Sequence, residues 1–539
     1  MIRIAWLLVR RHRIALLAWI LGLLVLVSIT APSYEATYGD PQSRAVLVDQ
    51  MQSTQGSTVL YGRLPDPGTL GQLFAWETGS YIVILAAVMA VILAIAFTRG
   101  EEDSGRLEVL RATGVRPGAP LGAALLVLTL ACAAVGGGSA AILAAQSTTI
   151  DELTVAGALA YGAAAFLAAL CLGLWAIICA QLRPDARSAR SLAFVALAVG
   201  FAERVVADFG DGWWADALQW LTPFGWKAVV APYTDDRFWA LLPMAGLCAL
   251  FAAVGVGLSR RRELRGSVLG DVAGRARAIR VATPERWAWL SARGSLIGWT
   301  VAVLGTAALF GSMADGLVTT IASDPATGDL LRDIGRAPVD PVATYFEFLG
   351  SFVAVLVMIC GTLLTLRWRG EESSGRLVQE LATGVRRWRS LLARVFVAAI
   401  GSMALLALAG LVMGLIGRAQ LAEGEPMAYA LSATLGETPG ILAAVAGAAL
   451  LTAVAPRWTG LIWAVVAWSG FTVFFGALVD LPQWALDLSL LGHPPAGSPG
   501  GTPDWAGWVD SLTLGLTGAA VVGVGVAALS IGRRDLRLG

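Results

Sequence analysis

The residues best suited to polar chemistry lie in one charged stretch that the chain carries twice. The first copy, RGEEDSGRLEVLRATGVR, spans residues 99–116, and the second, RGEESSGRLVQELATGVR, spans residues 369–386. The copies are identical at thirteen of eighteen positions. Their carboxylates and guanidinium groups suit ion pairing with a second surface, and two copies suit a partner with two-fold symmetry. The residues expected to make that contact are Glu101, Glu102, Ser104, Gly105, Arg106, Leu107, Glu371, Glu372, Ser374, Gly375, Arg376 and Leu377.

Residues for bond-making chemistry are scarce. Lys227 is the single lysine and lies in FGWKAV, so no P-loop exists, because a P-loop needs Gly-Lys-[Ser/Thr] to reach the phosphates. His12 and His493, the only histidines, fit no zinc or triad motif. The cysteines lie inside apolar runs and are interpreted as packing residues. We therefore expect no catalytic residue, no metal site and no cofactor in this chain, which is not predicted to be an enzyme.

Composition indicates a membrane protein. Hydrophobic residues make up 57% of the 539 residues and charged residues 14%, whereas soluble domains carry about 25% charged residues. A helix crosses the hydrocarbon layer in about 20 residues. Such runs occur at residues 14–31, 78–98, 119–145, 153–180, 191–207, 238–258, 294–313, 348–366, 395–416, 440–455, 461–479 and 512–531. We predict an all-α protein with twelve transmembrane helices.

Arginine placement predicts the orientation, because cytoplasmic loops retain positive charge. Arginines precede the first span and follow the sixth and the twelfth, so both termini are expected in the cytoplasm of a bacterial cell, with the chain in the plasma membrane. GLSRRREL at residues 257–264 closes the first six helices as SIGRRDL at residues 530–536 closes the second six. The chain is therefore predicted to be two parallel six-helix repeats, a fused pseudo-dimer.

The predicted domains follow from this repeat. Residues 1–258 form the first half, with an interfacial elbow at residues 1–12. Residues 259–284 form an arginine-rich cytoplasmic linker. Residues 285–539 form the second half, with an elbow at about residues 285–293.

Each charged stretch is predicted to form a short amphipathic helix in the cytoplasmic loop after the second span of its half. Ser104 and Ser374 are suitable N-cap residues, and Gly114 and Gly384 stand where a helix of roughly nine residues would stop. An ordinary basic loop that only sets topology is the alternative. Arginine alone would satisfy that role, however, without a repeated Gly-Glu-Glu and Ser-Gly-Arg-Leu pattern.

The elbows, the six helices per half and the acidic helix between the second and third spans resemble the membrane subunit of type V ABC exporters. The fused form with Arg-Gly-Glu-Glu and Ser-Gly-Arg-Leu resembles actinobacterial permeases that export polyketide antibiotics and tetronasin-like polyethers. The resemblance implies coupling helices seated on two copies of an ATP-binding subunit, which would hold the ATP and magnesium. The halves differ where the first reads LTPFGW (221–226) and the second LSLLGHPP (488–495).

Several polar and aromatic residues are candidates for a substrate path. Glu77 and Glu347 stand at the outer end of the second span of each half; a carboxylate in contact with interfacial water is the alternative. Glu203 and Arg204 either line an outer gate or cap a re-entrant segment after a short fifth helix. The aromatics of residues 461–479 either contact a large apolar ligand or form an interfacial belt. The full candidate set is Trp76, Glu77, Tyr81, Glu203, Arg204, Phe346, Glu347, Trp468, Phe471 and Phe475.

From these observations we expect a permease subunit of an ATP-driven exporter that extrudes hydrophobic or amphipathic compounds from the cytoplasm or inner leaflet. Its partners are two ATP-binding subunits, the lipid bilayer and a small hydrophobic substrate, and no nucleic acid. The alternatives are a proton-coupled secondary transporter, with Glu203 as its membrane acid, and a lipid exporter.

Overall fold

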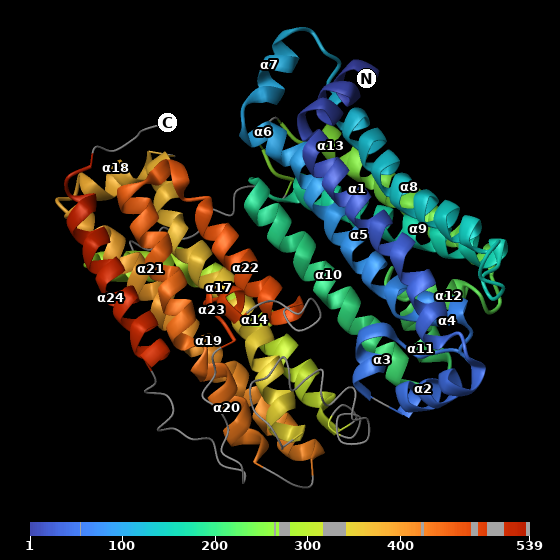
Figure 1. The fold of residues 1–539 in the computed structure, drawn as a ribbon. Helices are drawn as coiled ribbons and strands as arrows, with labels where there is room; N and C mark the ends of the chain where they lie inside the picture. The colour runs from blue at the N-terminus through green and yellow to red at the C-terminus, as the bar shows by residue number, and fades with distance from the viewer. Residues whose placement is uncertain are drawn as a thin grey trace. The chain divides into compact units, whose positions relative to one another are not determined.

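The computed structural model describes residues 1–53, 55–263, 266–268, 281–315, 318, 341–373, 375–421, 425–475, 483–492 and 511–534. In these residues the regular secondary structure is entirely helical, as Figure 1 shows. The chain divides into two compact units, residues 1–277 and 278–539. Each unit is described below by itself.

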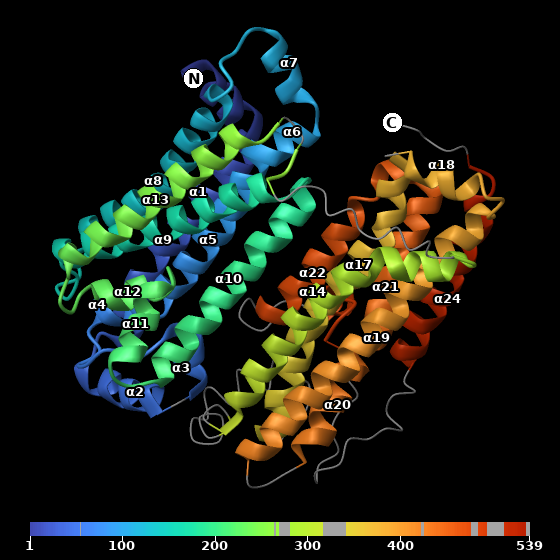
Figure 2. The ribbon, with the colours of Figure 1, turned by 180° about the vertical axis from the view of Figure 1, so that it is seen from behind.

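Unit 1 is a bundle of long helices around α9. The long helices are α1 (Ile2–Tyr38), α5 (Thr78–Ile95), α8 (Ala119–Gln146), α9 (Val155–Leu182), α10 (Ala186–Phe209) and α13 (Leu241–Arg261). The short helices are α2 (Pro41–Ser53), α3 (Gln55–Tyr61), α4 (Leu70–Trp76), α11 (Trp213–Leu221) and α12 (Trp226–Val230). They gather at the end of the bundle opposite the first charged stretch (Figures 1 and 2). We call the end that holds the charged stretch the motif end and the other the far end.

Small residues let the central helix of unit 1 approach its neighbours closely. A Cβ atom placed on Gly162 of α9 would lie 2.4 Å from the carbonyl oxygen of Gly136 on α8. Only glycine fits such a contact, and small residues at helix interfaces are typical of membrane bundles. This composition explains why α9 is largely buried although its sequence is mostly alanine, glycine and leucine.

Unit 2 has a similar set of helices. They are α14 (Pro284–Ser312), α17 (Pro341–Ser373), α18 (Arg376–Leu381), α19 (Arg387–Gln420), α20 (Pro426–Gly436), α21 (Thr438–Val454), α22 (Leu461–Phe475), α23 (Gln483–Asp487) and α24 (Ser511–Ile531). The core of this unit is formed mainly by α14, α17, α19 and α21.

All the predicted spans fall on helices, and ten helices of the described residues are long and apolar enough to cross a membrane. Two predicted spans do not reach that standard. One is α10, which contains Glu203, Arg204 and Asp208, and the other is α22, whose described part has 15 residues. The chain is thus a multi-helix protein of membrane type, and the count of twelve stays a prediction.

The predicted elbows are not separate elements. Helix α1 runs without a break from Ile2, and α14 runs without a break from Pro284, so each predicted elbow is the first part of a longer helix. Each predicted elbow is thus continuous with its span, and its location at the membrane interface stays a prediction.

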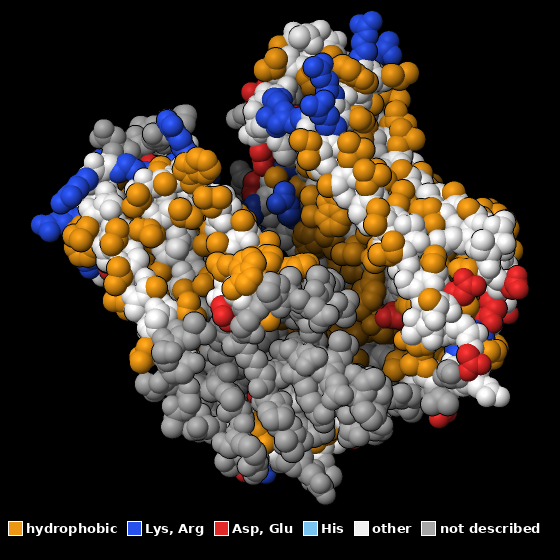
Figure 3. Space-filling view, viewed as in Figure 1, with side chains coloured by type: hydrophobic (Ala, Val, Ile, Leu, Met, Phe, Trp, Pro, Cys, Tyr) orange, Lys and Arg blue, Asp and Glu red, His pale blue; other side chains and the backbone are white. Residues whose placement is uncertain are grey.

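The outward face of the long helices is apolar. On α1, Leu17, Leu21, Val25 and Ile29 are each 55–56% exposed and stand four residues apart, so they form one stripe. Figure 3 shows hydrophobic side chains over much of the visible surface of unit 1, with Lys and Arg side chains gathered at the motif end. A stripe of this kind suits contact with lipid chains rather than water.

Candidate functional site

The first charged stretch is built on the end of α5. That helix continues through residues 96–100 and α6 (Glu101–Asp103), and the chain then turns at Gly105 into α7 (Arg106–Ala112). Gly105 has a φ of 73°, in the left-handed region that favours glycine. The predicted helix therefore exists, but it is shorter than expected. The residue before it is Gly105, and the side chain of Ser104 caps nothing: its Oγ donates to the carbonyl of Glu101.

The second stretch repeats this backbone. Helix α17 ends at Ser373, Gly375 has a φ of 73°, and α18 follows. The predicted stop glycines, Gly114 and Gly384, have φ values of 79° and 87°, which confirms their role as helix terminators. Ser374 lies outside the described residues.

The left-handed turn predicts a measurable stability difference between two glycines. A Cβ atom on Gly375 would meet nothing within 4 Å, so Gly375→Ala should cost about 1–2 kcal/mol through the backbone alone. Gly370 also has open space around it but is helical, so Gly370→Ala should be neutral or stabilising by up to about 1 kcal/mol. Thermal unfolding of the purified variants measures both changes. Equal effects at the two positions would contradict the turn.

Glu102 of the first stretch is buried against two arginines of unit 1. Its side chain is 1% exposed, and Arg99, 0% exposed, lies 3.1 Å from it. Arg262, just after the end of α13, donates to both carboxylate oxygens at 2.7 Å. The Nε atom of Arg262 also donates to Gln181 at 2.6 Å. A carboxylate held in this bidentate way is a strong, directional contact.

Glu372 has the same surroundings in unit 2. Its side chain is 0% exposed, Arg369 lies 3.0 Å away, and Arg534, after the end of α24, makes a closer ion pair. Arg534 also donates to the carbonyl of Thr452 and lies over the ring of Trp368. We call the two pairs, Arg262 with Glu102 and Arg534 with Glu372, the arginine latch.

The latch changes the interpretation of two predicted contact residues. We expected Glu102 and Glu372 to sit in the grooves of a partner, but both carboxylates are inside the chain and paired with its own arginines. Buried charges are costly unless paired, so they are not free to face a second protein. Their role is to fix the charged stretch to the last long helix of each unit.

The first glutamates make pairs of their own. Glu101 lies 2.9 Å from Arg106 and 3.1 Å from Arg11 of α1. Glu371 pairs with Arg394 of α19, which also lies 2.6 Å from Glu380. These contacts tie each stretch to a neighbouring long helix.

The surface that remains for a partner is the outer side of α7 and α18. Val109 is 68% exposed and Val378 is 41% exposed, and neither was among the predicted contact residues. Arg376 is exposed as well. The leucines differ between units: Leu377 is buried, whereas Leu107 is half-buried and borders a cavity of about 380 Å³ with Leu110 and Phe97. Helix α7 thus packs more loosely than α18.

At the far end of unit 1, the structure brings several substrate-path candidates together. Trp76 and Arg204 line one pocket. The ring of Tyr61 lies 4.7 Å from that of Trp76 and 5.4 Å from that of Tyr81, centroid to centroid. Glu77 accepts a hydrogen bond of 2.5 Å from Tyr34. Its side chain is half-buried, so water can reach only part of it.

Glu203 and Arg204 do not act as a pair. Arg204 is buried and lies 3.2 Å from Asp208, one helical turn later, while Glu203 is half-buried. Helix α10 continues to Phe209, so the re-entrant segment after a short fifth helix is wrong. The spacing of four residues between Arg204 and Asp208 is the sequence signal for this pair.

The unit 2 candidates lie in different surroundings. Phe346 is fully buried near the start of α17, beside the half-buried Glu347. Trp468 and Phe471 stack on α22 with ring centroids 5.8 Å apart, and the Trp468 indole donates to the Ala485 carbonyl. The side chain of Phe475 lies outside the described residues.

Comparison with known proteins identifies the family. The family described as "Multidrug efflux system permease Rv1217c, C-terminal domain" matches residues 5–260 and 281–529. The chain belongs to this efflux permease family. A similar curated protein is the multidrug efflux system permease protein Rv1217c of Mycobacterium tuberculosis (strain ATCC 25618 / H37Rv). It is 29% identical over 547 residues, which cover 98% of this chain and 94% of that protein.

Family and fold together establish the general class of this protein. An efflux permease with ten apolar helices among its described residues is a multi-pass membrane protein. As the permease of an efflux system, it is a transporter component and acts with partner components. The latch and the exposed helix faces belong to this permease.

Proposed function

We propose that this permease is the transmembrane subunit of an ATP-driven exporter, powered by two copies of a separate ATP-binding subunit. The observation that carries the proposal is that one construction occurs in both units: a left-handed glycine, a short exposed helix, and a buried glutamate latched by an arginine. A passive topogenic loop needs none of these features.

The latch supplies a route for mechanical coupling. A partner that moves α7 also moves α5, which runs directly into the charged stretch, and α13, which Arg262 connects to it. In unit 2, α18, α17 and α24 are connected in the same way through Arg534. ATP-driven closure of the partner would then favour one of two arrangements of the long helices.

The position of the basic residues supports the proposed orientation. Arg11, Arg262 and Arg534 all lie at a motif end, and the N-terminus lies beside α7 in unit 1 (Figure 2). Cytoplasmic ends are rich in arginine. We therefore place both motif ends and both termini in the cytoplasm, with twelve helices in two parallel six-helix halves in a bacterial plasma membrane.

The proposed substrates are hydrophobic or amphipathic compounds, antibiotics among them. The relative from M. tuberculosis is named a multidrug efflux permease, and the resemblance to type V exporters of polyketides and tetronasin-like polyethers fits the same class. A lipid is the alternative within this mechanism.

A second candidate function, proton-coupled transport, has one observation in its favour. Glu437, between α20 and α21, is 2% exposed. Its carboxylate accepts hydrogen bonds from Ser351 at 2.7 Å and from the Gly492 amide at 3.1 Å. No arginine or lysine of the described chain pairs with it. Acids inside membrane helices often carry protons, so Glu437 replaces Glu203 as the acid of this alternative.

Purification of the tagged chain from its native membrane in a mild detergent distinguishes the two functions. The exporter proposal expects an ATP-binding subunit at two copies per chain and ATP hydrolysis by the complex. A chain that purifies alone and transports substrate only on a proton gradient would overturn it, and Glu437→Gln should then abolish transport.

A further inference from the structure

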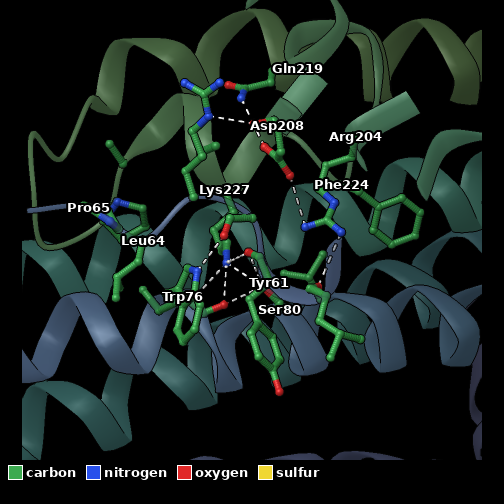
Figure 4. A pocket seen from close by; sticks show the side chains of 18 of the residues that line it. Tyr61, Leu64, Pro65, Trp76, Ser80, Arg204, Asp208, Gln219, Phe224 and Lys227 are labelled. Carbon is green, nitrogen blue, oxygen red and sulfur yellow. Dashed lines mark hydrogen bonds and ion pairs between the residues drawn. The ribbon is translucent and has the colours of Figure 1, made fainter. Parts of the chain in front are cut away.

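A pocket at the far end of unit 1 has an unusual charge arrangement. The cavity has a volume of about 270 Å³ and lies between the α3–α4 segment, α10, α11 and α12, as Figure 4 shows. Tyr61, Trp76 and Phe224 supply aromatic walls. Ligand pockets have volumes of roughly 300–1,000 Å³, so this cavity suits a head group and the first part of an apolar tail.

Two of the three basic residues that line the pocket are matched by acids. Arg204 pairs with Asp208 at 3.2 Å and lies over the ring of Phe201. Arg63 is largely exposed, donates to the Asp208 carbonyl, and pairs with Asp211 at 2.8 Å. The positive charges of Arg204 and Arg63 are therefore neutralised by nearby carboxylates.

Lys227 differs from both arginines. Its ammonium lies within hydrogen-bond distance of four neutral oxygens: the Ala75 carbonyl at 2.8 Å, the Trp76 carbonyl at 3.0 Å, the Ser80 hydroxyl at 2.5 Å and the Tyr61 carbonyl at 3.4 Å. In the part of the chain that the structure describes, no carboxylate lies within ion-pair distance of it. Lysines that are withdrawn from water are normally paired with an acid, so this ammonium lacks its usual counter-charge.

Electrostatics make this charge sensitive to a ligand. Burial, together with the positive charge of Arg204 and against the opposing effect of Asp208, lowers the pKa of Lys227 to about 7. At neutral pH the amine is therefore only partly protonated. An anion beside Lys227 would favour the charged form and raise its pKa.

We propose that this pocket binds the anionic head group of an amphipathic molecule, with a carboxylate against Lys227 and the apolar tail against Trp76, Tyr61 and Phe224. The inference goes beyond the proposed function, because it does not depend on what powers transport. Lys227 is the only lysine of the chain, so the second half, with LSLLGHPP in place of LTPFGW, cannot supply an equivalent amine. The binding site is therefore specific to unit 1.

Amine labelling tests the proposal at a single side chain. Acetic anhydride reacts with unprotonated amines, and peptide mass spectrometry of the whole chain in a neutral detergent would report the modification of Lys227, with free Nα-acetyl-lysine as the rate standard. We expect laurate to slow labelling at pH 7.5 by at least about tenfold. Dodecanol and dodecyltrimethylammonium, which carry the same tail, should slow it by less than about twofold. Equal effects of the three would overturn the proposal.

Direct binding of radiolabelled laurate gives a second readout that does not need the amine. Lys227→Gln keeps a hydrogen-bond donor for the carbonyls and removes the charge, so laurate affinity should fall about tenfold or more, while Lys227→Arg should retain it. Arg63→Gln removes a matched charge from the same pocket and should change affinity by less than about twofold. Equal losses in Lys227→Gln and Arg63→Gln would contradict the site. Protection by phosphatidylglycerol alone would support the anion site and identify a lipid as the source of the anion.

Discussion

Replacing Arg262 with methionine will destabilise unit 1 by about 3 kcal/mol, near the lower end of the roughly 3–5 kcal/mol that follows when one partner of a buried pair is removed. The loss is large because Glu102 is 1% exposed and loses both bidentate hydrogen bonds. It stays near the lower end because Arg99 remains beside the carboxylate. Arg534→Met should have a similar effect on unit 2 through Glu372. Thermal unfolding in detergent measures both.

The chain supplies matched controls for this prediction. Arg261 and Arg533 each precede a latch arginine and are exposed. Arg261→Met and Arg533→Met remove the same charge and should change stability by less than about 0.5 kcal/mol. If all four variants unfold alike, the latch contributes nothing. Reversal of the charges of Glu102 and Glu372 together should give a chain that folds poorly, because both carboxylates are buried against arginines.

The combined change Val109→Glu and Val378→Glu will prevent the ATP-binding subunit from co-purifying, with affinity lower by about 100-fold or more, or about 3 kcal/mol. Both side chains are exposed, on α7 and α18, so a charge there costs little in the free permease and much in a desolvated interface. The melting temperature should stay close to that of the unmodified chain.

The control for this pair is the same change at the other end of unit 1. Val155 begins α9 at the far end and is 52% exposed. Val155→Glu should leave co-purification and ATP hydrolysis unchanged. A double variant that still binds the subunit and hydrolyses ATP at the normal rate would exclude α7 and α18 as its seats.

The helices could be predicted from sequence because hydrophobic runs of membrane length are long and regular. The left-handed glycines could be predicted in part, since Gly114 and Gly384 follow short helical patterns. The latch could not, because Arg262 and Glu102 lie 160 residues apart, and no local pattern shows which arginine enters the protein. The signal available in the sequence was that both halves end in similar arginine-rich segments. Each half also contains one charged stretch, which holds the partner of such an arginine.

Other differences between the predictions from sequence and the structure also have long-range causes. Arg204 was assigned with Glu203 because they are adjacent, whereas the folded chain pairs it with Asp208 and the carbonyl of Val59. Lys227 was used only to exclude a P-loop, because FGWKAV does not reveal that its ammonium reaches the end of α4. Glu437 was missed because its neighbours resemble an ordinary interfacial turn.

The latch also has a consequence for biosynthesis. Glu102 is made long before Arg262, and Glu372 precedes Arg534 by 162 residues. At bacterial synthesis rates of 5–20 residues per second, each glutamate waits on the order of ten to thirty seconds for its arginine. Until then the acid has only the nearby Arg99 or Arg369 as its partner. Each charged stretch is therefore joined to the last long helix of its unit only when that helix has been inserted.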